Sequence, residues 1–274
     1  MISLINKKDM FNILSQAAQK GGQVLMDLYG KKIQIRSKSN PADIMTEADI
    51  KSQKAIIQSL EKSMAQKGLR KTEIGYITEE NFNRKGIHKF IIDPLDGTSD
   101  YSLETDRFAI SIAYTYQNEI LAGLIYNPVK NIFFFAQKNK GAYKITGKKR
   151  EKLFLDQKLF KKSLIALNSS SDKTNAIRMF KLAANLTPHV FRVKMFGSIV
   201  SNLMSVSGNK FQANINVGCR PWDLAAAKLI LEEAGGAILD WKGSPLKIDW
   251  VNTAKNYSII AGHRNILKQI LKYL

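Results

Sequence analysis

The residues best suited to chemistry in this chain are two aspartates three positions apart, Asp93 and Asp96, at the end of an apolar run. Pro94 fixes one backbone dihedral between them, so a tight turn can direct both carboxylates toward one point. Carboxylates that lie so close repel each other unless they share a proton or bind a divalent cation. The segment therefore favours a shared proton or a metal, although an Asp-rich turn can also serve only to cap the next element.

Gly97, Thr98 and Ser99 follow directly after this acidic pair. Because Gly97 has no side chain, the backbone N–H groups of this stretch can reach an anion if a helix begins there. A cation site next to an anion site is the arrangement that phosphate chemistry requires. The segment 93–99 is accordingly our candidate centre.

Three further acidic residues stand at the ends of predicted elements. Asp49 opens a helix in a capping-box pattern, Glu79 follows a strand, and Asp223 opens a late helix. Taken singly, Asp49 and Asp223 are explained as helix caps. Glu79 and Asp93 leave two consecutive strands, and ligand sites gather at such strand ends. Their combination is what favours a shared site.

The elements that must position these residues differ between the two halves of the chain. In the first half, Asp9 caps a helix that Gly30 ends, and a second helix follows Thr46. Strands are predicted at 73–77, 89–92, 107–114, 120–126 and 132–136, the last three separated by turn signals. These three runs predict an antiparallel meander.

The second half alternates between strand and helix patterns, which predicts a layered α/β sheet. The predicted strands are 164–167, 190–193, 211–215, 237–239 and 258–261, and the predicted helices are 174–184, 198–206, 223–234 and 265–273. The basic segment 148–162 interrupts the apolar pattern between the halves. We therefore expect two subdomains, 1–147 and 148–274, with the first carrying the Asp93–Thr98 motif.

The composition, 45% apolar and 24% charged over 274 residues, is that of an ordinary soluble globular protein. The single cysteine, Cys219, cannot form an internal disulfide, and without a neighbouring histidine pattern it gives little support to a catalytic thiol. No apolar run approaches the roughly 20 residues that a membrane span needs. The first residues show no basic-then-apolar signal pattern, so we expect a cytoplasmic protein.

The formal charge of +19 favours anionic partners. Nucleic acid is one candidate, but the basic residues are spread along the chain instead of being focused in an arm or recognition helix. Local exceptions are 31–38 and 148–162, the latter with seven basic and two acidic residues. A solvated lysine-rich surface accounts for most of this charge, which also suits a small phosphorylated substrate.

Together the acidic features resemble the inositol monophosphatase-like family of magnesium-dependent, often lithium-sensitive phosphatases. The matching motifs are Asp93-Pro94-Leu95-Asp96-Gly97-Thr98 (D-P-x-D-G-T), the strand end Thr78-Glu79-Glu80, and Arg220-Pro221-Trp222-Asp223-Leu224-Ala225-Ala226-Ala227 running on to Glu233-Ala234-Gly235-Gly236. Lys38–Asp43 with Thr46 and Asp49 resembles the N-terminal segment of the family. Their order and spacing hold over nearly the whole chain.

The resemblance implies an α+β and α/β chain folded as a layered αβαβα sandwich of the sugar-phosphatase type, with two or three Mg²⁺ between the subdomains. Glu79, Asp93 and the carbonyl of Leu95 would hold one ion, and Asp93, Asp96 and Asp223 a second. Asp49, with Glu79, would help a third through water. Thr98 and Glu79 would orient the attacking water, and the N–H groups of Gly97 and Thr98 would bind phosphate.

The substrate residues implied by the resemblance are Asp96, Gly97, Thr98, Lys194, Ser198, Asn216 and Asp223. Asn216 stands where inositol-phosphate-cleaving members carry a glutamate that contacts sugar hydroxyls. Lys194 stands where many members have arginine, and Asp100-Tyr101 replaces a common Asn-Phe pair. The metal ligands are intact, so these departures bear on the substrate and not on the reaction.

We therefore expect Mg²⁺-dependent hydrolysis of an inositol monophosphate-type monoester. The enzymatic alternative is a 3′(2′),5′-bisphosphate nucleotidase or another sugar or histidinol phosphatase of the same fold. The alternative from another class is a non-catalytic, basic nucleic-acid-associated protein, against which five converging carboxylates argue. The family is often dimeric, which makes a homodimer a further expectation.

Overall fold

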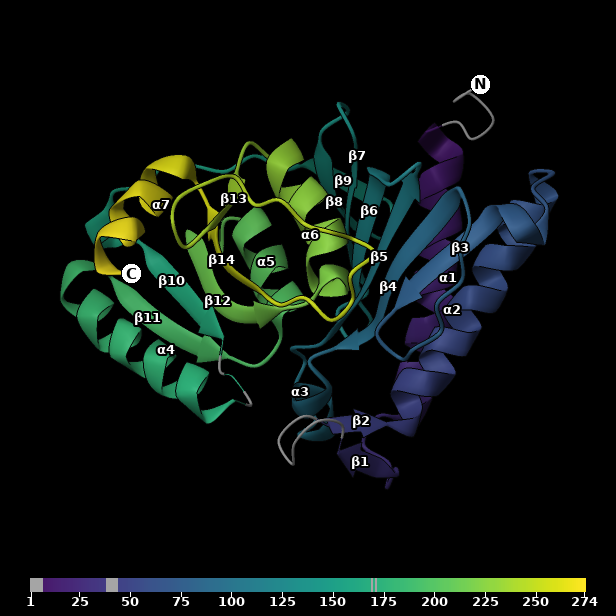
Figure 1. Cartoon of the computed structure of the whole chain (residues 1–274), viewed down its shortest axis with the longest axis horizontal. Helices are drawn as coiled ribbons and strands as arrows, with labels where there is room; N and C mark the ends of the chain where they lie inside the picture. The colour runs from purple at the N-terminus through teal and green to yellow at the C-terminus, as the bar shows by residue number, and fades with distance from the viewer. Residues whose placement is uncertain (1–6, 38–43, 169, 171) are drawn as a thin grey trace.

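The computed structural model describes residues 7–37, 44–168, 170 and 172–274. Within them the chain folds into alternating layers of helix and sheet (Figure 1). Helices α1 and α2 cover a seven-stranded sheet, α5 and α6 fill the space between this sheet and a five-stranded one, and α4 and α7 cover the outer face. The expected αβαβα sandwich is confirmed. The segment Lys38–Asp43 and the first six residues lie outside the described part of the chain.

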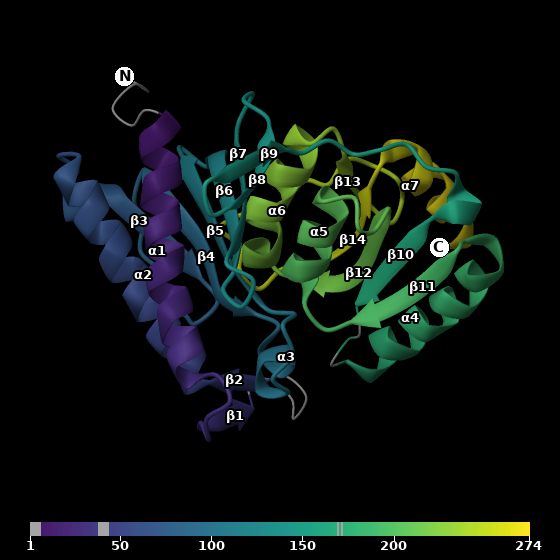
Figure 2. The ribbon, with the colours of Figure 1, turned by 180° about the vertical axis from the view of Figure 1, so that it is seen from behind.

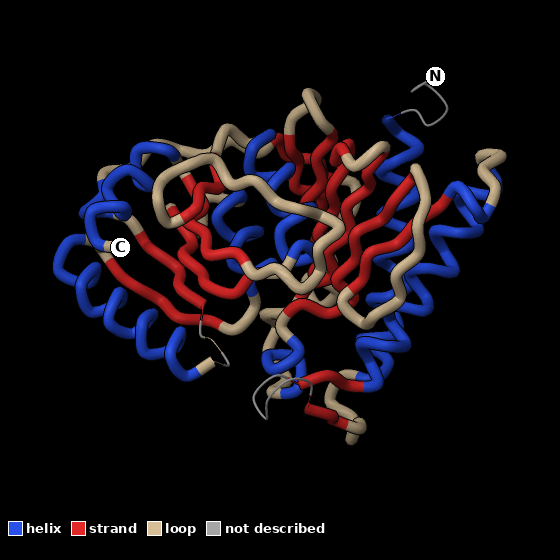
Figure 3. The backbone as a smooth tube through the Cα atoms, viewed as in Figure 1, coloured by secondary structure: helices blue, strands red, loops and turns tan. Residues whose placement is uncertain are grey.

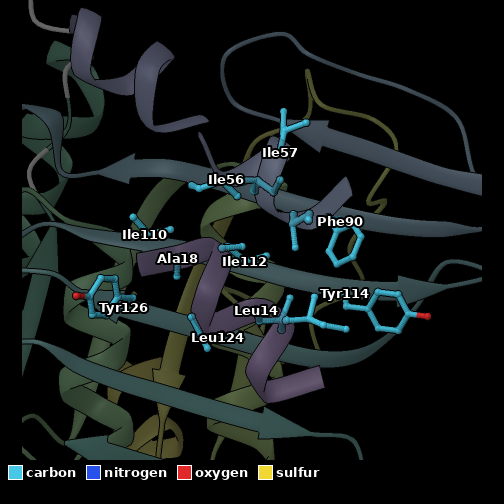
Figure 4. Close-up of a cluster of buried hydrophobic side chains, with 14 of the residues drawn as sticks. Leu14, Ala18, Ile56, Ile57, Phe90, Ile110, Ile112, Tyr114, Leu124 and Tyr126 are labelled. Atoms are coloured by element: carbon cyan, nitrogen blue, oxygen red, sulfur yellow. The ribbon is translucent and has the colours of Figure 1, made fainter. Parts of the chain in front are cut away.

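The outer layer of the first subdomain is the pair α1 (Lys7–Leu28) and α2 (Glu47–Gln66). Thr46 caps α2 as its sequence pattern predicts, because its hydroxyl oxygen accepts from the N–H of Ala48. A Cβ at Gly21 would lie 2.6 Å from Ile56 Cγ1, so the two helices pack at close range. Figure 4 shows the buried apolar side chains that these helices press onto the sheet.

The seven-stranded sheet follows chain order. Its strands are β3 (Ile74–Thr78), β4 (His88–Asp96), β5 (Ala109–Tyr116), β6 (Glu119–Asn127), β7 (Ile132–Gln137), β8 (Ala142–Thr146) and β9 (Lys149–Lys152). β3 is parallel to β4, and the later neighbours are antiparallel, which confirms the predicted meander.

The sequence pattern does not predict the β8–β9 hairpin, because the basic residues of β9 resemble those of a linker. Lysines on a sheet edge are a common protection against pairing with another chain. Because β9 pairs with β8, the change from one sheet to the other falls between Lys152 and Leu164. The predicted subdomain limit at 147/148 lies in the turn of this hairpin.

The five-stranded sheet has the order β11-β10-β12-β14-β13. Its strands are β10 (Leu164–Asn168), β11 (Arg192–Phe196), β12 (Ala213–Cys219), β13 (Ala237–Asp240) and β14 (Tyr257–Gly262). β10 is parallel to β11 and β12, whereas β14 is antiparallel to β12 and β13. Figure 3 shows the two sheets with helices between and outside them.

The remaining helices are α4 (Lys173–Leu186) and α7 (Arg264–Ile270) outside this sheet, and α5 (Ile199–Ser207) and α6 (Pro221–Glu233) between the sheets. The short elements are α3 (Thr98–Ser102), β1 (Ile35–Ser37), β2 (Ile44–Thr46) and the 3₁₀ turns Lys71–Glu73, Phe160–Lys162, Thr187–His189 and Leu271–Tyr273. None of the helices in the described segments is long and apolar enough to span a bilayer.

Helix α6 is the central element of the sandwich. Most of its residues are buried, as expected of a helix enclosed on several sides, and its charged residues Lys228, Glu232 and Glu233 are not among them. It packs on β6 where Gly123 leaves room, because a Cβ at Gly123 would lie 2.9 Å from the Cα of Ala226. This close contact sets the position of the N-terminus of α6, where Asp223 stands.

Replacing Gly123 with alanine tests this contact. The added methyl would press on the α6 backbone, and overpacking of this kind costs about 1–3 kcal/mol. We expect the free energy of unfolding in urea to fall by that amount. An unchanged denaturation midpoint would show that α6 does not pack here as described.

Candidate active site

The acidic motif lies where β4 departs from regular strand geometry. β4 pairs with β5 as far as Asp93, and the register shifts before Asp96. Such a bulge re-aims side chains, so two residues three positions apart can face one spot. The N–H of Leu95 donates to Asp93 Oδ1 at 3.0 Å, and Ser52 Oγ donates to the Pro94 carbonyl at 3.0 Å. These two bonds hold the turn.

Asp223 reaches the same spot from the first turn of α6. The N–H of Arg220 donates to Asp223 Oδ2 at 2.7 Å, which completes the helix cap and fixes the side chain. One carboxylate oxygen from each of Asp93, Asp96 and Asp223 lies within 4.8 Å of the others, and all three side chains are buried. Asp223 is thus part of the helix cap, but as the third residue of α6 and not as its N-cap, which is Arg220, and its carboxylate also belongs to an acidic cluster.

Burial and mutual repulsion disfavour the charged forms of this cluster. The pKa of Asp93 is raised well above its usual value, first by desolvation and then by the charges of Glu79, Asp96 and Asp223. Desolvation also raises the pKa of Asp96, to about 7, and that of Asp223. Among the described residues, no lysine or arginine forms an ion pair with Asp93, Asp96 or Asp223.

This donor set fits a divalent cation such as Mg²⁺. The oxygens are hard ligands, their spacing suits a small ion, and the nearby charge of Arg220 lowers the pKa of Asp223 less than burial and the charge of Asp96 raise it. Glu79 lines the same cleft from the end of β3, and its N–H donates to the carbonyl of Ile92 on β4 at 3.2 Å. The structure thus gathers the predicted carboxylates from β3, β4 and α6.

Asp96 is also bound by the second subdomain. The N–H groups of Val200 and Ile199, at the start of α5, donate to its carboxylate at 2.9 Å and 3.3 Å, and the Ser198 hydroxyl donates as well. These bonds partly offset the effect of burial on the pKa of Asp96. Ser198 therefore holds the Asp96 carboxylate by a hydrogen bond but does not itself line the cleft.

Thr98 and Asp49 form a second hydrogen-bonded contact beside the acidic cluster, within the first subdomain. The Thr98 hydroxyl lies 3.1 Å from Asp49 Oδ1 and 3.2 Å from the Leu95 carbonyl oxygen. Asp49 is fully buried, and its Oδ2 accepts from the N–H and the hydroxyl of Thr46. Gly97 precedes Thr98 with a φ of 86° and is the N-cap of α3. The start of α3 therefore lines the same cleft as the acidic cluster.

The cleft has a volume of about 440 Å³. Predicted residues that line it are Glu79, Asp93, Leu95, Asp96, Gly97, Thr98 and Asp223; other lining residues are Ile44, Ser99, Asp100, Ser170, Gly197, Ile199, Arg220 and Trp222. Asp49, Lys194, Ser198 and Asn216 are outside this lining. Arg220 and Trp222 could have been predicted from the sequence, because they stand next to Asp223 in its motif. No local sequence signal marks Ser170.

Two of the predicted substrate residues outside the lining, Lys194 and Asn216, lie away from the cleft for different reasons. Lys194 is exposed on β11, the edge strand of its sheet. Asn216 is buried on β12, and its Nδ2 has no hydrogen-bond partner. A larger cavity of about 580 Å³ lies between the β5–β6 turn and α6. In its lining, Lys138 forms an ion pair with Glu119 and Lys228 with Glu232. These charges neutralise one another and do not form an acidic cluster like that of Asp93, Asp96 and Asp223.

Known proteins resemble this chain in sequence and in fold. Residues 6–274 match the model of the inositol monophosphatase family. An inositol-1-monophosphatase of Mesorhizobium japonicum is 28% identical, with 96% of this chain and 95% of that protein covered. The Nus factor SuhB of Escherichia coli is 27% identical over 96% of this chain and 94% of its own length. The crystal structure of the extragenic suppressor protein suhB from Bartonella henselae superposes with a TM-score of 0.82 at 28% identity, covering 96% and 97% of the two chains.

The raised pKa values of the acidic cluster predict how pH affects the stability of the metal-free protein. Carboxyl groups of the unfolded chain ionise near pH ~4, whereas the pKa of folded Asp96 is about 7. The folded state therefore keeps this carboxyl proton up to a higher pH than the unfolded state does. As a result, the stability of the folded protein falls as pH rises from about 4 through 7. In EDTA, Asp223→Asn should melt higher than the wild type at pH 8, with a smaller difference at pH 5.

Asp106→Asn is the control, since Asp106 is half-exposed and pairs with Lys130 at 2.7 Å outside the cleft. It should show no pH-dependent gain. If Asp223→Asn melted lower than the wild type at both pH values, the cluster would not be a source of repulsion.

Proposed function

Because this chain belongs to the inositol monophosphatase family, we propose that its cleft hydrolyses a small phosphate monoester with the help of Mg²⁺. The observation that carries the proposal is the meeting of three buried carboxylates from β4 and α6 in a cleft that Glu79, directly after β3, also lines. Such a cluster is costly to fold unless a cation neutralises it, which is typical of a functional site. A purely structural role would not need it.

In this proposal Asp93, Asp96 and Asp223 hold a shared metal centre, with Glu79 and the Leu95 carbonyl on its β3–β4 side. When bound, divalent cations would lower the pKa of an attacking water and stabilise the leaving oxygen. The carboxylates would supply oxygen ligands and leave room for water and phosphate, as Mg²⁺ sites do.

The residues around the centre divide the remaining tasks. The amide end of α3 at Gly97 and Thr98 would hold phosphate oxygens through backbone N–H groups. The Thr98 hydroxyl, which donates to Asp49, would accept a hydrogen bond from the attacking water and orient it together with Glu79. Asp49 would thus act on the reaction through Thr98, and no protein nucleophile is required.

The cleft wall bears on the substrate class. Asp100, Arg220 and Trp222 line it, whereas Asn216 and Lys194 do not. A monoester of a hydroxylated compound suits the carboxylate and guanidinium groups, which can accept from and donate to hydroxyls. The inositol-1-monophosphatase relative supports an inositol phosphate as the first substrate to test. The basic charge of +19 keeps a bisphosphate as the enzymatic alternative.

A non-enzymatic role is the second candidate, because a relative of similar identity is named a Nus factor and this chain is strongly basic. Binding to RNA that weakens steeply with salt, without phosphate release in Mg²⁺, would favour that role. The intact acidic cluster favours catalysis instead.

Replacing Asp93 or Asp223 with asparagine tests the proposal. Removing one ligand charge weakens the metal centre more than the packing, so we expect kcat to fall at least about 100-fold while the circular dichroism spectrum is retained. Phosphate release should be measured over a range of Mg²⁺ concentrations, with Asp106→Asn as the matched control. Near-normal turnover of either variant at low Mg²⁺ would refute the assignment.

The substrate requires a separate measurement. Phosphate release from inositol phosphate, adenosine 3′,5′-bisphosphate, fructose bisphosphate and histidinol phosphate should be compared under one set of conditions. We expect a monoester in this group to be cleaved with Mg²⁺ and not with EDTA. No release from any of them would contradict the proposed reaction for these substrate classes.

A further inference from the structure

Arg107 lies in the loop between α3 and β5 of the first subdomain, yet its side chain contacts the second. Its Nη2 donates to Asn202 Oδ1 on α5 at 2.6 Å. Its guanidinium carbon lies 3.6 Å from the centre of the Phe196 ring, at the end of β11. Arg107 thus contacts residues on both sides of Gly197 and Ser198, which bring α5 to Asp96.

A chain of buried amides continues from this contact. Asn202 Nδ2 donates to Asn168 Oδ1 at 3.0 Å, and Asn168 Nδ2 donates to the Gly197 carbonyl at 3.0 Å. Asn214 adds a second donor to Asn168 Oδ1 at 2.9 Å. These asparagines are at most 1% exposed, so each bond forms in a medium where a lost partner is costly. The whole chain runs donor to acceptor from Arg107 to Gly197, and bonds in such a series reinforce one another.

The chain ends next to a proposed metal ligand. Gly197 precedes Ser198, the N-cap of α5, and the hydroxyl of Ser198 donates to Asp96 together with the N–H groups of Ile199 and Val200. A shift of Gly197 would therefore move three donors away from one carboxylate. Asp96 could then rotate, since no other described hydrogen bond fixes it.

The backbone of Arg107 packs closely against Gly97 of the acidic motif. A Cβ at Gly97 would lie 2.9 Å from the Arg107 carbonyl oxygen and 2.9 Å from Ser198 Cβ. Gly97 follows Asp96 directly, so Arg107 borders the acidic motif with its backbone and α5 with its side chain. The loop that contains Arg107 therefore contacts both segments that hold Asp96, the acidic motif itself and the start of α5.

We propose that Arg107 is a positioning residue for the reaction: through Asn202 and Asn168 it fixes Gly197 and Ser198, and thereby the orientation of Asp96. The inference deepens the proposed function and rests on it for its effect on catalysis. It differs from a general role as a contact between subdomains, because it assigns the effect to one segment, residues 196–200. That difference can be measured.

The direct test is hydrogen–deuterium exchange of the full-length protein, followed by peptides that cover 196–203. In Arg107→Met the amides of Ile199 and Val200 should exchange about tenfold faster, because the start of α5 is no longer held. Peptides from β5 and β6 should exchange as in the wild type. Equal acceleration throughout the protein would mean that Arg107 acts only on global stability, and this would overturn the proposal.

Three variants sharpen this experiment. Asn168→Ala breaks the chain at its other end and should reproduce the change, and the double variant with Arg107→Met should exceed neither single one, since both act through one chain. Arg107→Lys keeps the charge and should recover part of the protection. Arg178→Met is the matched control, because Arg178 also stacks on an aromatic ring, 4.1 Å from that of Trp241, but on α4. Additive effects, or an equal effect of Arg178→Met, would contradict the proposal.

Two functional readouts complete the test. Mn²⁺ binding, measured by electron paramagnetic resonance, should weaken about tenfold in Arg107→Met, and kcat should fall more than KM rises. Faster exchange at 199–200 with unchanged Mn²⁺ affinity and unchanged kcat would refute the link to the site. If the wild type cleaved no phosphate monoester, the proposed function would fail, while exchange and Mn²⁺ binding would still decide the role of Arg107.

Discussion

The central constraint on the structure is that three carboxylates, Asp93, Asp96 and Asp223, are buried close together, where desolvation first and the neighbouring negative charges second disfavour their charged forms. The fold holds them together although burial raises the pKa of each of them. Such an arrangement lowers stability unless a cation is bound, so the rest of the molecule must be rigid enough to impose it. The bulge in β4, the cap of α6 and the first turn of α5 each fix one of these side chains.

The layered fold explains how residues distant in sequence supply one site. Helix α6 lies between two sheets, and its close contact with Gly123 on β6 directs its first turn toward the end of β4. Stability and site geometry are therefore coupled through one helix. The second subdomain contributes α5, whose amide end binds Asp96. Its edge strand β11 lies farther out, and this explains why Lys194 does not line the cleft.

The acidic residues and most elements could be predicted from local patterns and from the family resemblance. Asp93 and Asp96 were identifiable because a proline turn follows an apolar strand, and α6 because an apolar helical pattern follows Asp223, although the helix itself begins two residues earlier, at Pro221. The β8–β9 hairpin was not, since basic edge residues resemble a linker. The Arg107–Asn202–Asn168 chain could not be predicted either, because hydrogen bonds between residues 34 and 95 positions apart leave no periodic signal.

The central claim is that the three carboxylates form a divalent cation site. The most direct measurement is anomalous X-ray diffraction from crystals soaked in Mn²⁺. We predict an anomalous peak bordered by oxygens of Asp93, Asp96 and Asp223, at distances of about 2.0–2.3 Å typical of such ions. Crystals of active protein that show no peak there, or a peak only elsewhere, would contradict the account.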